Sequence, residues 1–136
     1  HVRSRRQRQM CIRDREIVEL YEIAGRLDNP AHTRESIAKV DLEFHLAVAR
    51  VSRNPFMRSI SALIEAALAA SFQLSSPASS TEKIAECAGN HLRIVRAIAA
   101  RDEAAARLAM ENVIHVGVDR TMTALHADMP LTNAQA

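Results

Sequence analysis

The chain has 136 residues, of which 48% are hydrophobic and 25% are charged, enough for one globular domain with a buried core. This apolar fraction excludes a disordered chain, and the interruption of every apolar run within a turn or two excludes a membrane-spanning helix. Aromatic residues make up only 3% and alanine is abundant, so the core must be built from Ala, Ile, Val and Leu at helical spacing. The sequence therefore predicts an all-α protein.

The net charge is +2, but the positive charge is concentrated at the beginning of the chain. Six of the 18 basic residues lie in the first fifteen, beside a single acid, Asp14. The remainder holds 12 basic and 15 acidic residues, a net charge of −3, which is the wrong sign for a surface that binds phosphates. We therefore expect no nucleic-acid binding from the body of this chain. Cys11 and Cys87 lack CxxC spacing and no secretory signal is recognisable, which fits a reducing cytoplasm.

Residues 1–15 have a composition unlike the rest of the chain. They read HVRSRRQRQMCIRDR and show no apolar periodicity. A basic arm, a localisation signal or a solvated tail would each have this composition. The string RQRQMCIRDR resembles the translation of a sequencing-library adapter, however. We therefore expect residues 1–15 to be a non-native segment without a function of its own, and the natural chain to continue upstream in other sequence.

Apolar periodicity and capping residues predict five helices in the rest of the chain. Their expected ranges are 14–27, 33–52, 55–74, 81–101 and 102–125. Asn54 and Asp102 are the expected N-caps of the third and fifth helices, and the Ser-rich segment 75–80 is a loop by composition. One side of the third helix carries Phe56, Ile60, Leu63, Ile64, Ala67 and Leu68. Short loops indicate an antiparallel bundle of about five to six helices over residues 16–128, with a frayed tail at 129–136.

Three polar residues are expected to face the interior of this bundle. Asp41 and His45 lie four residues apart at the edge of the apolar side of the second helix, and His91 lies within the apolar stripe of the fourth. An i, i+4 pair places two ligands on one side of a cation and a facing helix supplies a third, so a divalent metal site is one interpretation. The alternative is a metal-free core, in which Asp41 bonds His45 and His91 bonds a carbonyl. The cost of burying Asp41 without a partner cation favours the metal, because neither inner helix face carries Lys or Arg.

Two segments in this order, DLEFHLAVARVSRNP and NHLRIVRAIAARDEAAARLAM, resemble the ligand-binding (FCD-type) domain of the FadR subfamily of GntR transcription regulators. The resemblance covers about residues 16–125. It implies a helical, homodimeric domain in which Asp41, His45 and His91 hold zinc, with nickel and manganese as alternatives. A small carboxylate effector would then bind at the open metal positions. The run ALAASFQL further resembles members that sense sugar acids such as galactonate, and DNA would be bound only through a winged helix-turn-helix missing from this chain.

Other residues give weaker signals. Asn54, Ser71 and Gln73 are candidates for lining the effector pocket, although Ser71, on the apolar side of the third helix, is equally well explained as a small packing residue. Many metal-binding members carry a further histidine on the last helix, where this chain has Val113. His115 lies two residues beyond Val113, about 200° around that helix from it, so we expect it at the surface or at a dimer face, and its ligation of the metal is disfavoured.

The combined prediction is the effector-sensing, metal-binding domain of a transcription regulator, which is not an enzyme and does not contact a membrane. Two alternatives stay open. A helical metalloenzyme would use the open metal site to activate water, but Glu43 faces outward and no inner carboxylate is left to act as its general base. A metal-free structural bundle would use the same three residues only as a polar core. Metal content separates the structural bundle from the other two, and turnover of candidate acids separates enzyme from sensor.

Overall fold

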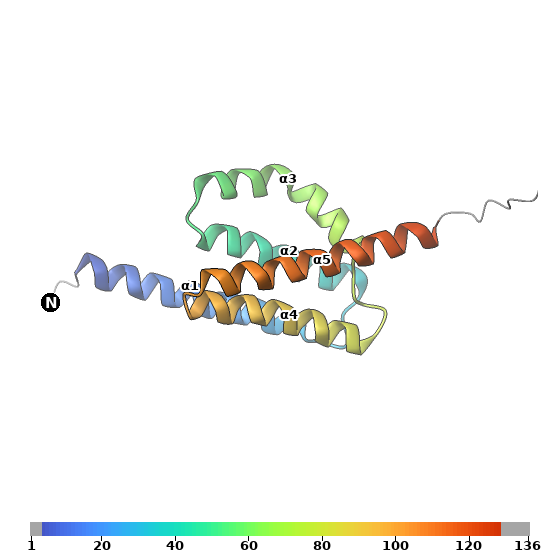
Figure 1. Ribbon diagram of the computed structural model, residues 1–136, viewed down its shortest axis with the longest axis horizontal. Helices are drawn as coiled ribbons and strands as arrows, with labels where there is room; N and C mark the ends of the chain where they lie inside the picture. The colour runs from blue at the N-terminus through green and yellow to red at the C-terminus, as the bar shows by residue number, and fades with distance from the viewer. Residues whose placement is uncertain (1–3, 129–136) are drawn as a thin grey trace, which may run out of the picture.

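The computed structural model describes residues 4–128 and folds them into five α-helices without a strand (Figure 1). The helices are α1 (Arg5–Leu27), α2 (Arg34–Val51), α3 (Pro55–Leu74), α4 (Thr81–Ala99) and α5 (Glu103–Ala127). The all-α prediction is confirmed. The predicted tail at 129–136 lies outside the described residues. None of the described helices is both long and apolar enough to cross a membrane.

Local capping chemistry sets most helix ends where the sequence predicts them. Thr33 is the N-cap of α2 and forms a capping box with Ser36. The side chain of Asn54 caps α3, and Pro55 occupies the first turn, where its missing N–H costs nothing. Asp102 caps α5 in the same way by accepting a hydrogen bond from a backbone N–H of the first turn. The order and spacing of α2 to α5 therefore follow from short-range interactions.

The first helix is longer than predicted. α1 begins at Arg5, well before the expected start at Asp14. Residues 5–13 contain neither proline nor glycine and are rich in arginine and glutamine, which have high helix propensity. They continue the helix without any apolar periodicity, so a prediction that depends on such periodicity misses them.

The five helices form a closed ring. Each helix packs against its two neighbours in the order α1, α2, α3, α5, α4 and back to α1, and the junction of α3 with α5 is the smallest of the five. Figure 1 shows α3 on the opposite side of the molecule from α1 and α4. Within the described residues, α2 and α4 are not neighbours along this ring, so their side chains meet only in its interior.

Two apolar clusters fill this interior. The larger cluster joins α1, α2 and α4 through Leu20, Ile23, Ala24, Phe44, Ala47, Ile94 and Val95. From α5, Ala109, Met110 and Val113 pack against it while remaining partly exposed. The smaller cluster is made of Leu27, Ile37, Ile84 and Ala88. Removal of this apolar surface from water is the main stabilising contribution to the fold, and it fixes α2 and α4 on opposite sides of one core.

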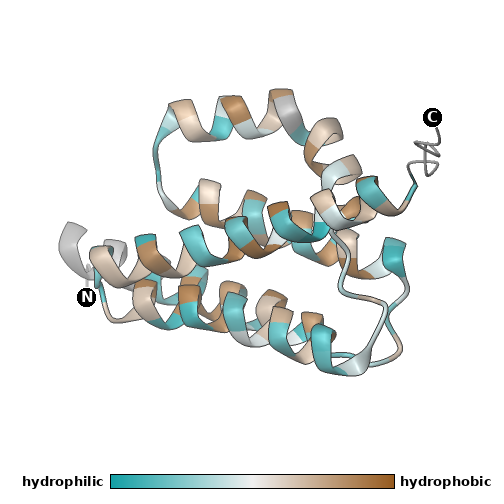
Figure 2. Ribbon diagram, turned by 45° about the vertical axis from the view of Figure 1, so that its right-hand side comes forward, coloured by the Kyte–Doolittle hydropathy of each residue, from teal (hydrophilic) through white to brown (hydrophobic). Residues whose placement is uncertain are grey.

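The apolar side of α3 is largely exposed, in contrast to those of α1, α2 and α4, which supply the buried core. Phe56 is 66% exposed and Leu63 is 83% exposed. Figure 2 shows hydrophobic segments along α3, which packs mainly on α2. Apolar periodicity identifies the hydrophobic side of a helix, but it does not say whether another element covers that side. Ser71 is likewise exposed, although the periodicity of α3 places it on the apolar side.

Candidate metal centre

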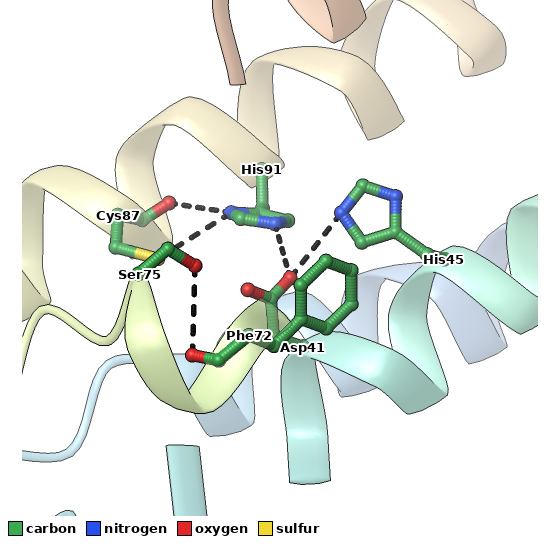
Figure 3. A network of polar contacts seen from close by, with 6 residues as sticks. All are labelled: Asp41, His45, Phe72, Ser75, Cys87 and His91. Atoms are coloured by element: carbon green, nitrogen blue, oxygen red, sulfur yellow. Dashed lines mark hydrogen bonds and ion pairs between the residues drawn. The ribbon is translucent and has the colours of Figure 1, made fainter. Parts of the chain in front are cut away.

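Asp41, His45 and His91 converge inside the ring (Figure 3). The first two lie one turn apart on α2, and His91 reaches them from α4. One ligand atom of each residue lies within 4.8 Å of the other two. The side chain of His91 is 2% exposed, whereas those of Asp41 and His45 are 15% and 17% exposed. The convergence expected from the helical spacing is therefore what the structure shows.

Both imidazoles direct the same ring nitrogen toward a single carboxylate oxygen. Nε2 of His91 lies 2.9 Å from Oδ1 of Asp41, and Nε2 of His45 lies 3.2 Å from the same atom. Asp41 thereby connects α2 and α4 across the interior of the bundle. The metal-free alternative has these same contacts, so the buried polar groups have hydrogen-bond partners even without an ion.

The backbone of α4 fixes the orientation and tautomer of His91. Its Nδ1 lies 2.7 Å from the carbonyl oxygen of Cys87, one turn earlier on the same helix. A carbonyl oxygen can only accept a hydrogen bond, so Nδ1 must carry the proton. In the neutral imidazole, Nε2 then has a free lone pair that points at Asp41. Such a second hydrogen bond is what orients most histidine ligands of metals.

Two phenylalanines hold the imidazole rings in place. Phe44, which is fully buried, presents its ring edge-on to His91 and His45, at centroid distances of 4.9 Å and 5.6 Å. Phe72, from the last turn of α3, packs against His45 at 5.2 Å. Edge-on and tilted ring pairs of this kind are attractive beyond their buried area. The two imidazole rings are thus positioned by apolar neighbours on α2 and α3.

The protonation states of Asp41 and His91 are coupled. Burial alone would lower the pKa of His91, but the hydrogen bonds to Asp41 and Cys87 and the charge of Asp41 outweigh it and raise this pKa from 6.5 to about 10. Burial alone would raise the pKa of Asp41, but the hydrogen bonds from His45 and His91 and the charges of both rings lower it well below its ordinary 3.8. Without metal, His91 and Asp41 therefore form a buried ion pair.

This ion pair predicts how the stability of the metal-free protein depends on pH. The pKa of His91 is higher in the folded than in the unfolded chain, so its contribution is complete below pH 6.5 and is lost as the pH rises toward 10. The contribution of Asp41 is complete above pH 3.8 and is lost as the pH falls further. In the presence of chelator, we expect the free energy of unfolding to fall by at least about 1.4 kcal/mol between pH 6 and pH 9, the value of one pKa unit.

Urea unfolding at several pH values measures this dependence. The His91→Gln variant should lose the alkaline decline, whereas His115→Ala should keep it because His115 lies on the surface of α5. An identical decline in His91→Gln would show that other groups are responsible.

The geometry of the three residues fits a divalent ion. Zinc binds nitrogen and oxygen at about 2.0–2.2 Å, which places two ligand atoms of one tetrahedral ion roughly 3.3–3.6 Å apart. The contacts of Asp41 at 2.9 Å and 3.2 Å are close to this spacing, and Nε2 of His91 needs only to lose its proton to become a ligand. One carboxylate and two imidazoles form a donor set typical of zinc and of other first-row metals.

The other predicted residues do not reach this centre. The side-chain oxygen of Asn54 accepts the N–H of Phe56 and serves as the cap of α3. Ser71 and Gln73 are both exposed, and their predicted contact with an effector stays a prediction. His115 is exposed on α5, as expected. On the same helix, Val113 packs against the larger apolar cluster, so this side of the core presents an apolar residue.

Sequence reasoning missed three groups around the centre. The Cys87 carbonyl is a backbone atom, and no sequence pattern marks it as the partner of His91. Phe72 has the same apolar spacing as its neighbours, which gives no sign that it contacts His45. Ser75 lies in a serine-rich segment typical of loops, yet it is only 9% exposed. Glu43, in contrast, is on the surface as predicted, where it pairs with Arg26.

Comparison with known families places this geometry in context. A family model for the FCD domain matches residues 9–116, which is more than half of the chain. The chain therefore belongs to the FCD domain family. FCD domains are the effector-binding domains of GntR-family transcription regulators, which bind DNA through another domain and are not enzymes, and they often bind a metal. No curated protein and no solved structure matches the chain significantly.

Proposed function

We propose that this FCD domain senses a small carboxylate through a divalent metal ion held by Asp41, His45 and His91. The observation that carries the proposal is the convergence of these three side chains from two facing helices, with Nε2 of His91 left as the ligand atom by the hydrogen bond of Nδ1 to Cys87. We favour zinc because of the nitrogen and oxygen donor set, with nickel and manganese as alternatives.

The charge of the centre favours an anionic effector. Three protein ligands, only one of them anionic, leave a divalent ion with a net positive charge and exchangeable waters, so a carboxylate can replace water and gain charge-assisted contacts. A neutral apolar molecule would not replace the water and would gain no charge-assisted contacts. Glu43 is paired on the surface, and no other described carboxylate joins the three ligands. The role of the site residues is therefore to hold the ion and to keep the imidazole rings oriented. The resemblance of ALAASFQL to sugar-acid sensors narrows the effector to a sugar acid or another hydroxy acid.

The regulator that this proposal describes is a cytoplasmic homodimer of the FadR subfamily, which reaches DNA through a winged helix-turn-helix domain. Support for the dimer comes from α5, which packs one side on the bundle and exposes a second apolar side. That side carries Ile114, Val118, Met122 and Leu125, each about half exposed. A helix that is apolar on two sides is typical of an element between two packed surfaces. Sedimentation that shows only monomer over a wide concentration range would count against the dimer.

Calorimetric titration of zinc-loaded protein with galactonate, lactate and citrate tests the proposed function. We expect at least one of these acids to bind, and to lose about 100-fold or more in affinity in Asp41→Ala and His91→Ala, which remove protein ligands of the ion. His115→Ala is the matched control, and its affinity should equal that of the wild type. Acid binding that survives both ligand substitutions would refute a metal-mediated mechanism, and conversion of an acid into product would indicate an enzyme.

A further inference from the structure

Building on the proposed function, we propose that the effector reaches the ion through the junction of α3 with α5. This route would pass Phe72 in the last turn of α3, Ser75 directly after that helix, and Gly117 on α5. These effector contacts differ from the ones that the sequence predicts, at Asn54, Ser71 and Gln73.

The packing of the ring leaves this junction as the weakest closure. On the side of α1, α2 and α4, the larger apolar cluster contains residues such as Leu20, Phe44 and Val95, which are all 0% exposed. The α3–α5 contact is the smallest around the ring. His91 is almost fully buried, whereas Asp41 and His45 keep a small exposed fraction. Solvent therefore reaches the ligand side chains on α2, the helix against which α3 packs.

The end of α3 is the part of that helix that reaches the three ligands. Phe72 packs on the ring of His45, and Ser75 follows one turn later (Figure 3). The Ser75 hydroxyl donates to the carbonyl oxygen of Phe72 at 3.5 Å, the upper limit for a hydrogen bond. A carboxylate oxygen of an effector would be a stronger acceptor for this buried donor. Phe72 in turn offers a flat apolar surface to the carbon chain.

The position of Gly117 along α5 follows from how α5 packs on α4. α4 and α5 run antiparallel: Asn90 and Asn112 line the same groove, and Glu86 pairs with Arg120 at 3.7 Å. The turn around Gly117 is therefore level with Cys87, which lies one turn before His91 on α4. Gly117 follows Val113 by one turn, on the side of α5 that packs toward the core, yet an added Cβ would meet nothing within 4 Å. α5 thus leaves free space at this level.

The variant Gly117→Leu tests the route, because leucine favours helix and would occupy that space. The probes are azide, galactonate and citrate, titrated into cobalt-loaded protein and followed by the visible absorption of the metal. We expect Gly117→Leu to weaken galactonate and citrate binding by about tenfold or more, and to change azide binding by less than about twofold. Gly89→Leu is the matched control, since Gly89 is exposed on α4 and its Cβ would also meet nothing within 4 Å.

Ser75→Ala is a second and milder variant, in case Gly117→Leu disturbs the fold. Loss of the hydroxyl should lower galactonate affinity by about tenfold while cobalt affinity stays at the wild-type value. If the wild type binds cobalt and galactonate but both variants bind galactonate equally well, the access route is wrong and the proposed function stands. If the wild type binds no cobalt, or binds cobalt and none of the acids, the proposed function and this inference are both overturned.

Discussion

Removing the ion from metal-loaded protein is expected to lower the free energy of unfolding by about 2.7 kcal/mol, if free metal had been held at about 100 times its dissociation constant. The effect arises because the three ligands form a site only in the folded chain, where α4 brings His91 to Asp41, 50 positions earlier in the sequence. For a domain of this size, the melting temperature should fall by roughly 10 °C. Calorimetric melting with and without chelator measures both quantities.

Substitutions of the metal-ligating residues distinguish the loss of stability caused by metal removal from a general action of the chelator. His91→Ala should bind metal about 100-fold more weakly or worse, since even loss of a partner of a ligand costs up to about that factor. The melting temperature of this variant should then be insensitive to chelator. His115→Ala should keep both the metal and the chelator response. Equal melting of wild-type protein with and without chelator, after elemental analysis has shown bound metal, would contradict the link between metal and stability.

Phe44→Ala is expected to cause the largest loss of stability of any single substitution discussed, about 3–5 kcal/mol. Phe44 is 0% exposed and belongs to the larger apolar cluster, so its removal leaves a cavity between α1, α2 and α4. The same ring supports both His45 and His91, and its loss should therefore loosen the metal site as well.

Phe56→Ala is a matched control within the same chain. It removes the same atoms from a helix, but Phe56 is 66% exposed, so we expect a change of less than about 0.5 kcal/mol. Urea unfolding at a fixed pH compares the two variants directly. Similar losses in both would mean that Phe44 is not part of the stabilising core, or that α3 is packed more tightly than described.

The sequence was most informative where structure depends on neighbouring residues. The N-caps Asn54 and Asp102 occupy their predicted places, because capping joins a side chain to a backbone group two or three positions away. The extension of α1 to Arg5 was missed because propensity without periodicity leaves no pattern. The exposure of α3 was missed for a different reason, since what covers a helix depends on the whole ring.

For the candidate site, too, the sequence predicted what depends on neighbouring residues and missed what depends on distant ones. Helical spacing alone predicted that Asp41, His45 and His91 would meet, because it needs only the position of each residue on its helix. Burial of Asp41 favours a metal less strongly than the sequence indicated, since a protonated His91 is itself a cation at 2.9 Å from the carboxylate. The contacts of Phe72 and Ser75 depend on where α3 ends relative to α2, which short-range patterns do not encode.

The larger apolar cluster also constrains the order in which the chain can fold during its synthesis. Leu20 and Ile23 belong to α1, whereas Ile94 and Val95 belong to α4, so the cluster cannot close until α4 has left the ribosome. At about 5–20 residues per second, α1 waits several seconds for this partner. During that interval its apolar side, together with those of α2 and α3, is open to chaperones and to other nascent chains.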